Sequence, residues 1–90
     1  MSSVERTVQI VNRQGLHARP AAEIVKLAAR YKSDITLQRD DLEVNGKSIM
    51  GVMMLAAEYG SSLQLRASGD DAQQAVDALA QLIANKFGER

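Results

Sequence analysis

Hydrophobic and polar positions along the chain follow two periods, and each change of period marks a new structural element. Residues 5–11 alternate loosely, with Val8 and Ile10 on one side and polar side chains between them, which predicts a strand. Residues 18–31 then change to helical spacing, which predicts an amphipathic helix whose apolar stripe is formed by Ala21, Ile24, Val25, Ala28 and Tyr31. Pro20 lies in the first turn of this helix, where its missing N–H group has no intrahelical partner to lose.

Both periods recur after the first helix. Residues 35–38 and 42–44 alternate and predict two strands, joined by a turn at residues 40–41. Ser48 is a typical N-cap residue, so a short helix is expected over residues 49–56. The chain therefore returns from strand to helix shortly after its midpoint.

A fourth strand, over residues 63–67, precedes a final helix with the longest apolar stripe of the sequence, formed by Ala72, Ala75, Val76, Leu79, Leu82, Ile83 and Phe87. Every predicted strand has one apolar and one polar face, which suits an antiparallel-rich sheet with one solvated side. We therefore expect one domain over residues 1–90, a two-layer α/β sandwich with the helices on a single face of a four-stranded sheet.

Composition and charge narrow the classes of function. The 90 residues carry 11 basic and 11 acidic side chains, so the chain lacks the basic stripe expected of a nucleic-acid-binding protein. The longest apolar run, residues 49–57, is too short to span a bilayer, and the first residues do not resemble an export signal. With one histidine and no cysteine, the chain is poorly equipped for a metal site. These features predict a neutral cytoplasmic protein that neither binds nucleic acid nor inserts into a membrane, and no metal is expected.

The only histidine lies in the segment Gly15-Leu16-His17-Ala18-Arg19-Pro20-Ala21, at the expected start of the first helix. Histidine is a poor cap, so the N–H groups of Ala18 and Arg19 should stay available at the positive end of the helix dipole. Such helix ends bind phosphate, and the Arg19 guanidinium suits phosphate oxygens. A ring nitrogen of His17, expected to be exposed, could then accept a phosphoryl group. The alternative is a surface histidine beside a solvated arginine.

These seven residues resemble the active-site motif of the HPr family, the histidine-containing phosphocarriers of the bacterial phosphoenolpyruvate-dependent phosphotransferase system. A second segment, Gly46-Lys47-Ser48-Ile49-Met50-Gly51-Val52-Met53, is similar to the regulatory-serine segment of that family, and the resemblance covers essentially the whole chain. It implies an α+β open-faced sandwich of order βαββαβα, with three helices on one face of a four-stranded antiparallel sheet. It also implies that His17 accepts a phosphoryl group on Nδ1 from phosphorylated enzyme I and passes it to an enzyme IIA domain. Arg19 would contact the phosphate, and the protein would be a carrier without a cofactor rather than an enzyme.

The second segment combines a cap with an apolar surface. A helix of two turns cannot bury its whole circumference, so some methionines should be exposed, while we expect one of Met53 and Met54 to fill the core. The resemblance implies phosphorylation of Ser48 by HPr kinase/phosphorylase, which would place negative charge beside this surface. It further implies a partner-docking surface formed by Arg19, Lys26, Lys47, Ile49, Met50 and Met53.

Two acidic clusters have simpler explanations. Asp40, Asp41 and Glu43 suit a hairpin turn better than a cation site. Asp70 and Asp71 complement the dipole of the last helix.

Other functions stay open from the sequence. The chain could serve the nitrogen-related branch of the phosphotransferase system, or act as a regulatory relative that binds a transcriptional regulator. It could also be an anion-binding or oligomerising domain in which His17 is incidental. We expect a monomer.

Overall fold

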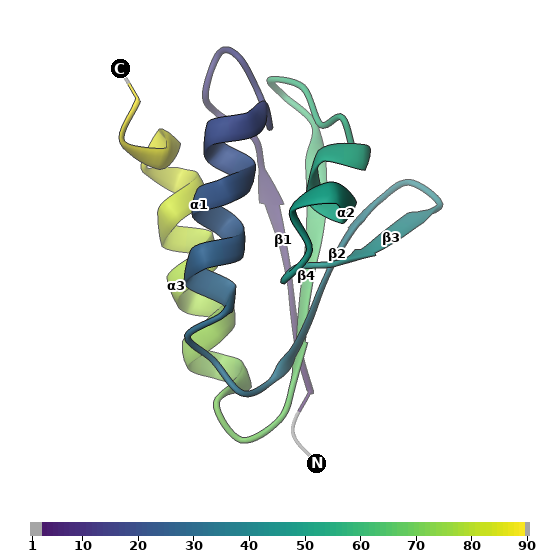
Figure 1. Ribbon diagram of the computed structural model, residues 1–90, viewed down its shortest axis with the longest axis vertical. Helices are drawn as coiled ribbons and strands as arrows, with labels where there is room; N and C mark the ends of the chain where they lie inside the picture. The colour runs from purple at the N-terminus through teal and green to yellow at the C-terminus, as the bar shows by residue number, and fades with distance from the viewer. Residues whose placement is uncertain (1–2, 90) are drawn as a thin grey trace.

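Four strands form one sheet in the structure, a computed structural model that describes residues 3–89 (Figure 1). They are β1 (Ser3–Gln9), β2 (Asp34–Arg39), β3 (Leu42–Asn45) and β4 (Ser62–Ser68), and they lie in the order β1-β4-β2-β3. Every neighbouring pair is antiparallel. The sheet predicted from the alternating segments is therefore confirmed.

The central strand β4 shows why one face of the sheet is covered. Leu63, Leu65 and Ala67 are fully buried, whereas the alternating Gln64 and Arg66 are exposed to solvent. Because side chains along a strand point to opposite faces in turn, this alternation places one face against the core and the other in water.

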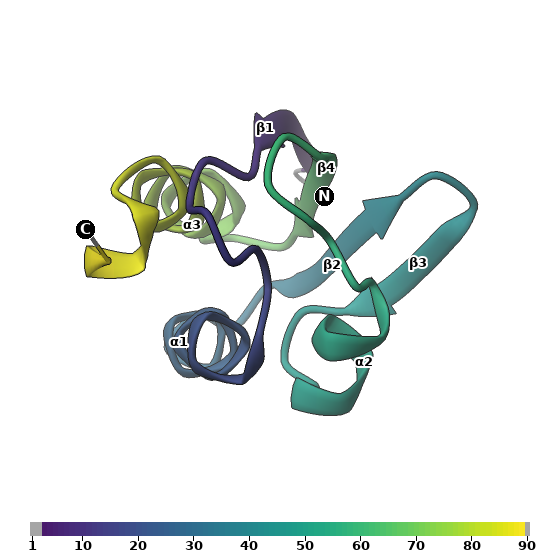
Figure 2. The same ribbon diagram turned by 90° about the horizontal axis from the view of Figure 1, so that it is seen from above.

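Three helices, α1 (Ala18–Ala28), α2 (Ile49–Met54) and α3 (Ala72–Ala84), cover the apolar face, and a short 3₁₀ turn, η1 (Lys86–Gly88), follows α3 (Figure 2). The order of helices and strands is βαββαβα, and the predicted two-layer architecture is confirmed. The core between the two layers is built mainly from Ile10, Ile24, Leu37, Val52, Leu63, Leu65, Val76, Leu79 and Ile83. Among residues 3–89, no helix is long and apolar enough to cross a membrane.

The ends of the elements differ from the predicted ones by one to three residues. Strand β1 ends at Gln9, because Gln9 pairs with Ser62, the first residue of β4. Helix α1 ends at Ala28, and Tyr31 donates its N–H to the Ala28 carbonyl three residues back, as in a tightened last turn. Helix α2 ends at Met54, two residues before the predicted end. Ala56 does not continue the helix because its φ of 48° is left-handed.

Asp71 makes contacts that the sequence analysis did not predict. Although it is the N-cap residue of α3, its side chain makes no cap hydrogen bond. Its carboxylate instead accepts from the Ser33 hydroxyl and from the N–H groups of Lys32 at 2.8 Å and Ser33 at 2.9 Å. The Ser33 hydroxyl, followed by the Lys32 N–H, lowers the pKa of Asp71 below its usual value, because both stabilise the charged form. This side chain therefore ties the α1–β2 loop to the start of α3.

Candidate functional site

The loop before α1 lies directly against the chain that follows α2. Leu16 donates its N–H to the Ala57 carbonyl at 2.9 Å. Gly15 has a φ of +67°, and a Cβ atom at this position would lie only 2.4 Å from the Ala57 oxygen. Only glycine allows both this left-handed backbone and this close approach. The contact sets the position of His17, two residues further on.

The start of α1 is uncapped, as the sequence predicts. His17 is the N-cap in extended conformation, and its side chain makes no cap hydrogen bond. Ala21 donates to the His17 carbonyl at 3.1 Å, and Pro20 has no N–H. Within residues 3–89, no backbone or side-chain acceptor takes the N–H groups of Ala18 and Arg19. These two donors therefore point out of the positive end of the helix dipole.

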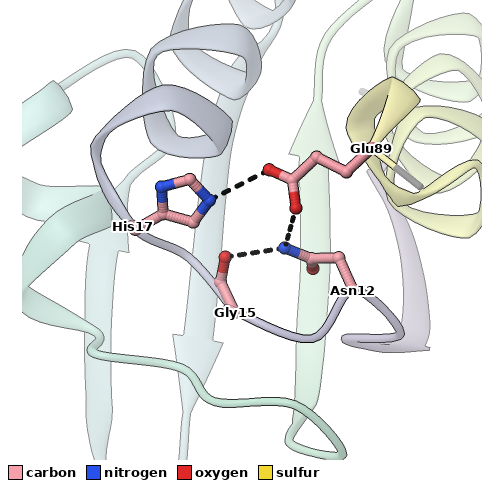
Figure 3. Close-up of polar contacts among 4 residues, drawn as sticks. All are labelled: Asn12, Gly15, His17 and Glu89. Carbon is pink, nitrogen blue, oxygen red and sulfur yellow. Dashed lines mark hydrogen bonds and ion pairs between the residues drawn. The ribbon is translucent and has the colours of Figure 1, made fainter.

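The His17 ring is paired with a carboxylate from the other end of the chain. Its Nε2 atom lies 2.9 Å from Oε2 of Glu89, while Nδ1 lies on the side of the ring away from Glu89 (Figure 3). The side chain of His17 is 37% exposed and that of Glu89 is 22% exposed. The expected exposed ring is therefore half-buried.

Asn12 holds Glu89 from the opposite side. Its Nδ2 atom donates to Oε1 of Glu89 at 3.2 Å and to the Gly15 carbonyl at 2.8 Å (Figure 3). The Asn12 residue is buried, with 1% of its surface exposed. Asn12 and Glu89 are site residues that the sequence analysis missed.

An irregular turn brings Glu89 to the histidine. After α3, Lys86 and Phe87 adopt left-handed φ values of 58° and 57°. Such a conformation costs about 1–2 kcal/mol for a residue that carries a Cβ. Phe87 is half-buried and packs against the core, which helps to hold the turn. The predicted apolar stripe of the last helix therefore continues to Phe87, but the helix itself ends at Ala84.

The side chains around the ring form one shallow hollow of about 350 Å³, lined by Arg13, Gln14, His17, Arg19 and Glu89. Two guanidinium groups and the N-terminus of α1 supply positive potential there, and one carboxylate opposes them. An oxyanion of phosphate size suits this combination of charges and donors.

The second predicted segment forms α2, where Ser48 is the N-cap and its Oγ atom accepts from the Gly51 N–H at 3.1 Å. The predicted capping role of Ser48 is confirmed. Val52 is the only residue within α2 that is buried. Four neighbouring side chains, which we call the methionine patch, are exposed: Ile49, Met50, Met53 and Met54.

One expectation for this region needs correction. Neither Met53 nor Met54 fills the core, since they are 41% and 64% exposed. The reason is that α2 has six residues and turns a single position, Val52, into the core. Lys47 is partly buried, and its Nζ atom donates to the Tyr31 carbonyl at 2.7 Å. Lys26 is exposed on α1, as a docking residue requires.

Comparison with known proteins identifies the family of the chain. The sequence model of the family described as "PTS HPr component phosphorylation site" matches residues 4–85. The chain is 49% identical to phosphocarrier protein HPr of Cupriavidus necator, with 96% of this chain and 97% of the relative covered. It is 52% identical to phosphocarrier protein HPr of Treponema pallidum, with 96% and 98% covered.

Solved structures give the same result. The crystal structure of HPr-C-His from Thermoanaerobacter tengcongensis superposes with a TM-score of 0.93 at 47% identity, covering 97% of this chain and 98% of that one. An HPr dimer from the same organism has a TM-score of 0.78 at 48% identity, with 91% and 94% covered. The four-stranded sheet, the helix order and the sequence together show that the chain belongs to the HPr family of phosphocarrier proteins of the phosphotransferase system.

Proposed function

We propose that Nδ1 of His17 accepts a phosphoryl group from phosphorylated enzyme I and passes it to an enzyme IIA domain. The lone pair of Nδ1 forms the new N–P bond while the bond between phosphorus and the donor atom of enzyme I breaks, and that electron pair stays on the donor. In the second transfer, an acceptor atom of enzyme IIA forms a bond to phosphorus while the N–P bond breaks, and that electron pair returns to Nδ1. The chain acts as a carrier, in keeping with its family, and undergoes no net change over one cycle.

The observation that carries this proposal is the uncapped start of α1 beside His17. Phosphoryl transfer depends on positioning and on stabilisation of charge more than on covalent help from the protein. The free N–H groups of Ala18 and Arg19, with the helix dipole behind them, are donors already oriented before the phosphoryl group arrives. The Arg19 side chain lines the same hollow and supplies a full positive charge.

Replacing His17 by Ala tests the proposal. Purified protein is incubated with phosphoenolpyruvate and enzyme I, and the intact mass is measured. We expect the wild type to gain one acid-labile phosphoryl group and His17→Ala to gain none. The matched control is Gln81→Ala, an exposed position on α3, which should be labelled like the wild type. Labelling of the alanine variant at the wild-type rate would refute the assignment.

We further propose that Ser48 is the target of HPr kinase/phosphorylase and that partners dock on the methionine patch together with Arg19 and Lys26. Helices α1 and α2 lie side by side (Figures 1 and 2), so the two groups of residues belong to neighbouring elements. An exposed apolar patch of this kind is typical of a contact site. A phosphate on Ser48 would adjoin Ile49 and repel an acidic or apolar partner. Lys47 contributes less directly, because its amine already binds the Tyr31 carbonyl.

The oligomeric state is a separate question. The sequence predicts a monomer, whereas one solved relative is a dimer. Light scattering at micromolar concentration measures the mass directly, and a value near twice that of one chain would contradict the prediction.

A further inference from the structure

The contact between Glu89 and His17 determines which ring nitrogen of neutral His17 carries the proton. A carboxylate accepts hydrogen bonds and donates none, whereas a neutral imidazole has one N–H donor and one acceptor nitrogen. Because Nε2 lies 2.9 Å from Oε2 of Glu89, the proton of the neutral ring is held on Nε2. The lone pair is then on Nδ1, which is the nucleophile of the proposed function.

Asn12 determines where the Glu89 carboxylate lies. Its Nδ2 group donates both to Oε1 of Glu89 and to the Gly15 carbonyl. Both partners are acceptors, so the amide must present its nitrogen to them and not its oxygen. The Oδ1 atom of Asn12 is buried and has no partner among residues 3–89, so Nδ2 makes all the side-chain hydrogen bonds of this residue found there. One amide group therefore links the loop before α1 to the end of the chain.

We propose that Asn12 and Glu89 are positioning residues that keep neutral His17 in the Nε2–H tautomer, with Nδ1 free to attack phosphorus. The effect of the tautomer on phosphoryl transfer rests on the proposed function, whereas the tautomer itself follows from the hydrogen bonds of Glu89 and Asn12. Glu89 reaches this position only through the left-handed turn at Lys86 and Phe87. A costly backbone conformation next to a site is often retained because the site requires it. The other charged groups that line the hollow, Arg13 and Arg19, are donors and cannot replace the carboxylate as an acceptor.

Two substitutions at Glu89 should act differently. Glu89→Ala removes the acceptor, so the ring returns to the tautomer ratio of the unfolded chain. In Glu89→Gln, Asn12 Nδ2 would hold the amide oxygen, because it can pair only with an acceptor. The amide nitrogen would then face His17 Nε2 and donate to it, which moves the ring proton to Nδ1 and blocks the nucleophile.

The tautomer is measured by ¹⁵N chemical shifts of the two ring nitrogens, in unphosphorylated protein at a pH where the ring is neutral. We expect a strong Nε2–H preference in the wild type, the unfolded ratio in Glu89→Ala, and an Nδ1–H preference in Glu89→Gln. A neutral histidine without a partner already favours Nε2–H, so initial phosphorylation by enzyme I should fall only slightly in Glu89→Ala. It should fall about tenfold in Glu89→Gln, because the fraction of His17 rings with a free Nδ1 lone pair becomes small. The control Glu43→Gln removes the same charge from exposed strand β3 and should change neither measurement.

The role of Asn12 is tested in the Glu89→Gln background. Without Asn12, the amide introduced by Glu89→Gln can turn either way, so Asn12→Ala combined with Glu89→Gln should lose the Nδ1–H preference and transfer faster than Glu89→Gln alone. Circular dichroism shows whether this double variant is folded. An unchanged tautomer ratio in Glu89→Ala would overturn the proposal, and so would a persistent Nδ1–H preference in the folded double variant. Because the tautomer is measured without enzyme I, failure of the proposed function would appear separately, as absence of labelling in the wild type.

Discussion

Replacing Gly15 by Ala should cost more stability than any other conservative change in the loop before α1. The added Cβ has two effects. It places a residue other than glycine at a φ of +67°, which costs about 1–2 kcal/mol. It also lies 2.4 Å from the Ala57 oxygen, and since that atom belongs to the backbone, the two segments must move apart.

Displacing the Gly15 backbone in this way weakens two hydrogen bonds. They are the bond from the Leu16 N–H to Ala57 at 2.9 Å and the buried bond from Asn12 to the Gly15 carbonyl at 2.8 Å. Each contributes about 1 kcal/mol net, so the total loss should be about 3–4 kcal/mol. For a domain of this size, each kcal/mol lowers Tm by about 4–8 °C, and a decrease of at least ~12 °C is expected.

Gly60→Ala is the matched control. Gly60 also has a positive φ, +88°, but a Cβ there would have no neighbour within 4 Å. Its loss should be limited to the backbone cost of about 1–2 kcal/mol. Urea titrations followed by circular dichroism measure the free energy of unfolding of both variants. Gly15→Ala should be less stable than Gly60→Ala by about 2 kcal/mol on this reasoning. Equal losses would show that the approach to Ala57 contributes nothing.

Three further predictions concern the site and the α1–β2 loop. Arg19→Glu should slow phosphorylation of His17 strongly and leave Tm nearly unchanged, because the side chain is exposed; a large fall in Tm with normal transfer would make Arg19 a structural residue. Ser48→Ala should lose about 0.5–2 kcal/mol of stability with near-normal transfer from enzyme I, whereas Ser48→Asp should keep the cap and slow transfer; equal rates for Ser48→Asp and the wild type would remove the support for regulation by charge. The pKa of Asp71 is lowered in the folded state, so its contribution is complete above the ordinary value of 3.8 and is lost as the pH falls towards the folded pKa. Asp71→Asn should therefore have a lower free energy of unfolding at neutral pH, and this free energy should decrease less than that of the wild type as the pH falls below 3.8. Urea titrations at several pH values measure it, and the same decrease in acid for the variant and the wild type would contradict the prediction.

The sequence by itself determined the features that depend on neighbouring residues. Alternation placed Leu63, Leu65 and Ala67 on one face of a strand, and helical spacing defined the buried stripes. Local rules also identified Ser48 as a cap and His17 as a helix start without one. These features were predictable because hydrogen bonds at a helix end and the direction of a side chain depend on residues within one or two turns.

Only the tertiary structure decided the contacts between distant parts of the chain. Glu89 meets His17 across 72 positions, because α3 ends at Ala84 and two left-handed residues then turn the chain back. Asp71 follows the composition of a helix start, yet it binds Ser33 because the α1–β2 loop lies within reach. The exposure of Met54 likewise depends on how α2 lies on the sheet. Such contacts carry no local signal, since the position of each partner is set by the packing of the whole core and not by the adjacent residues.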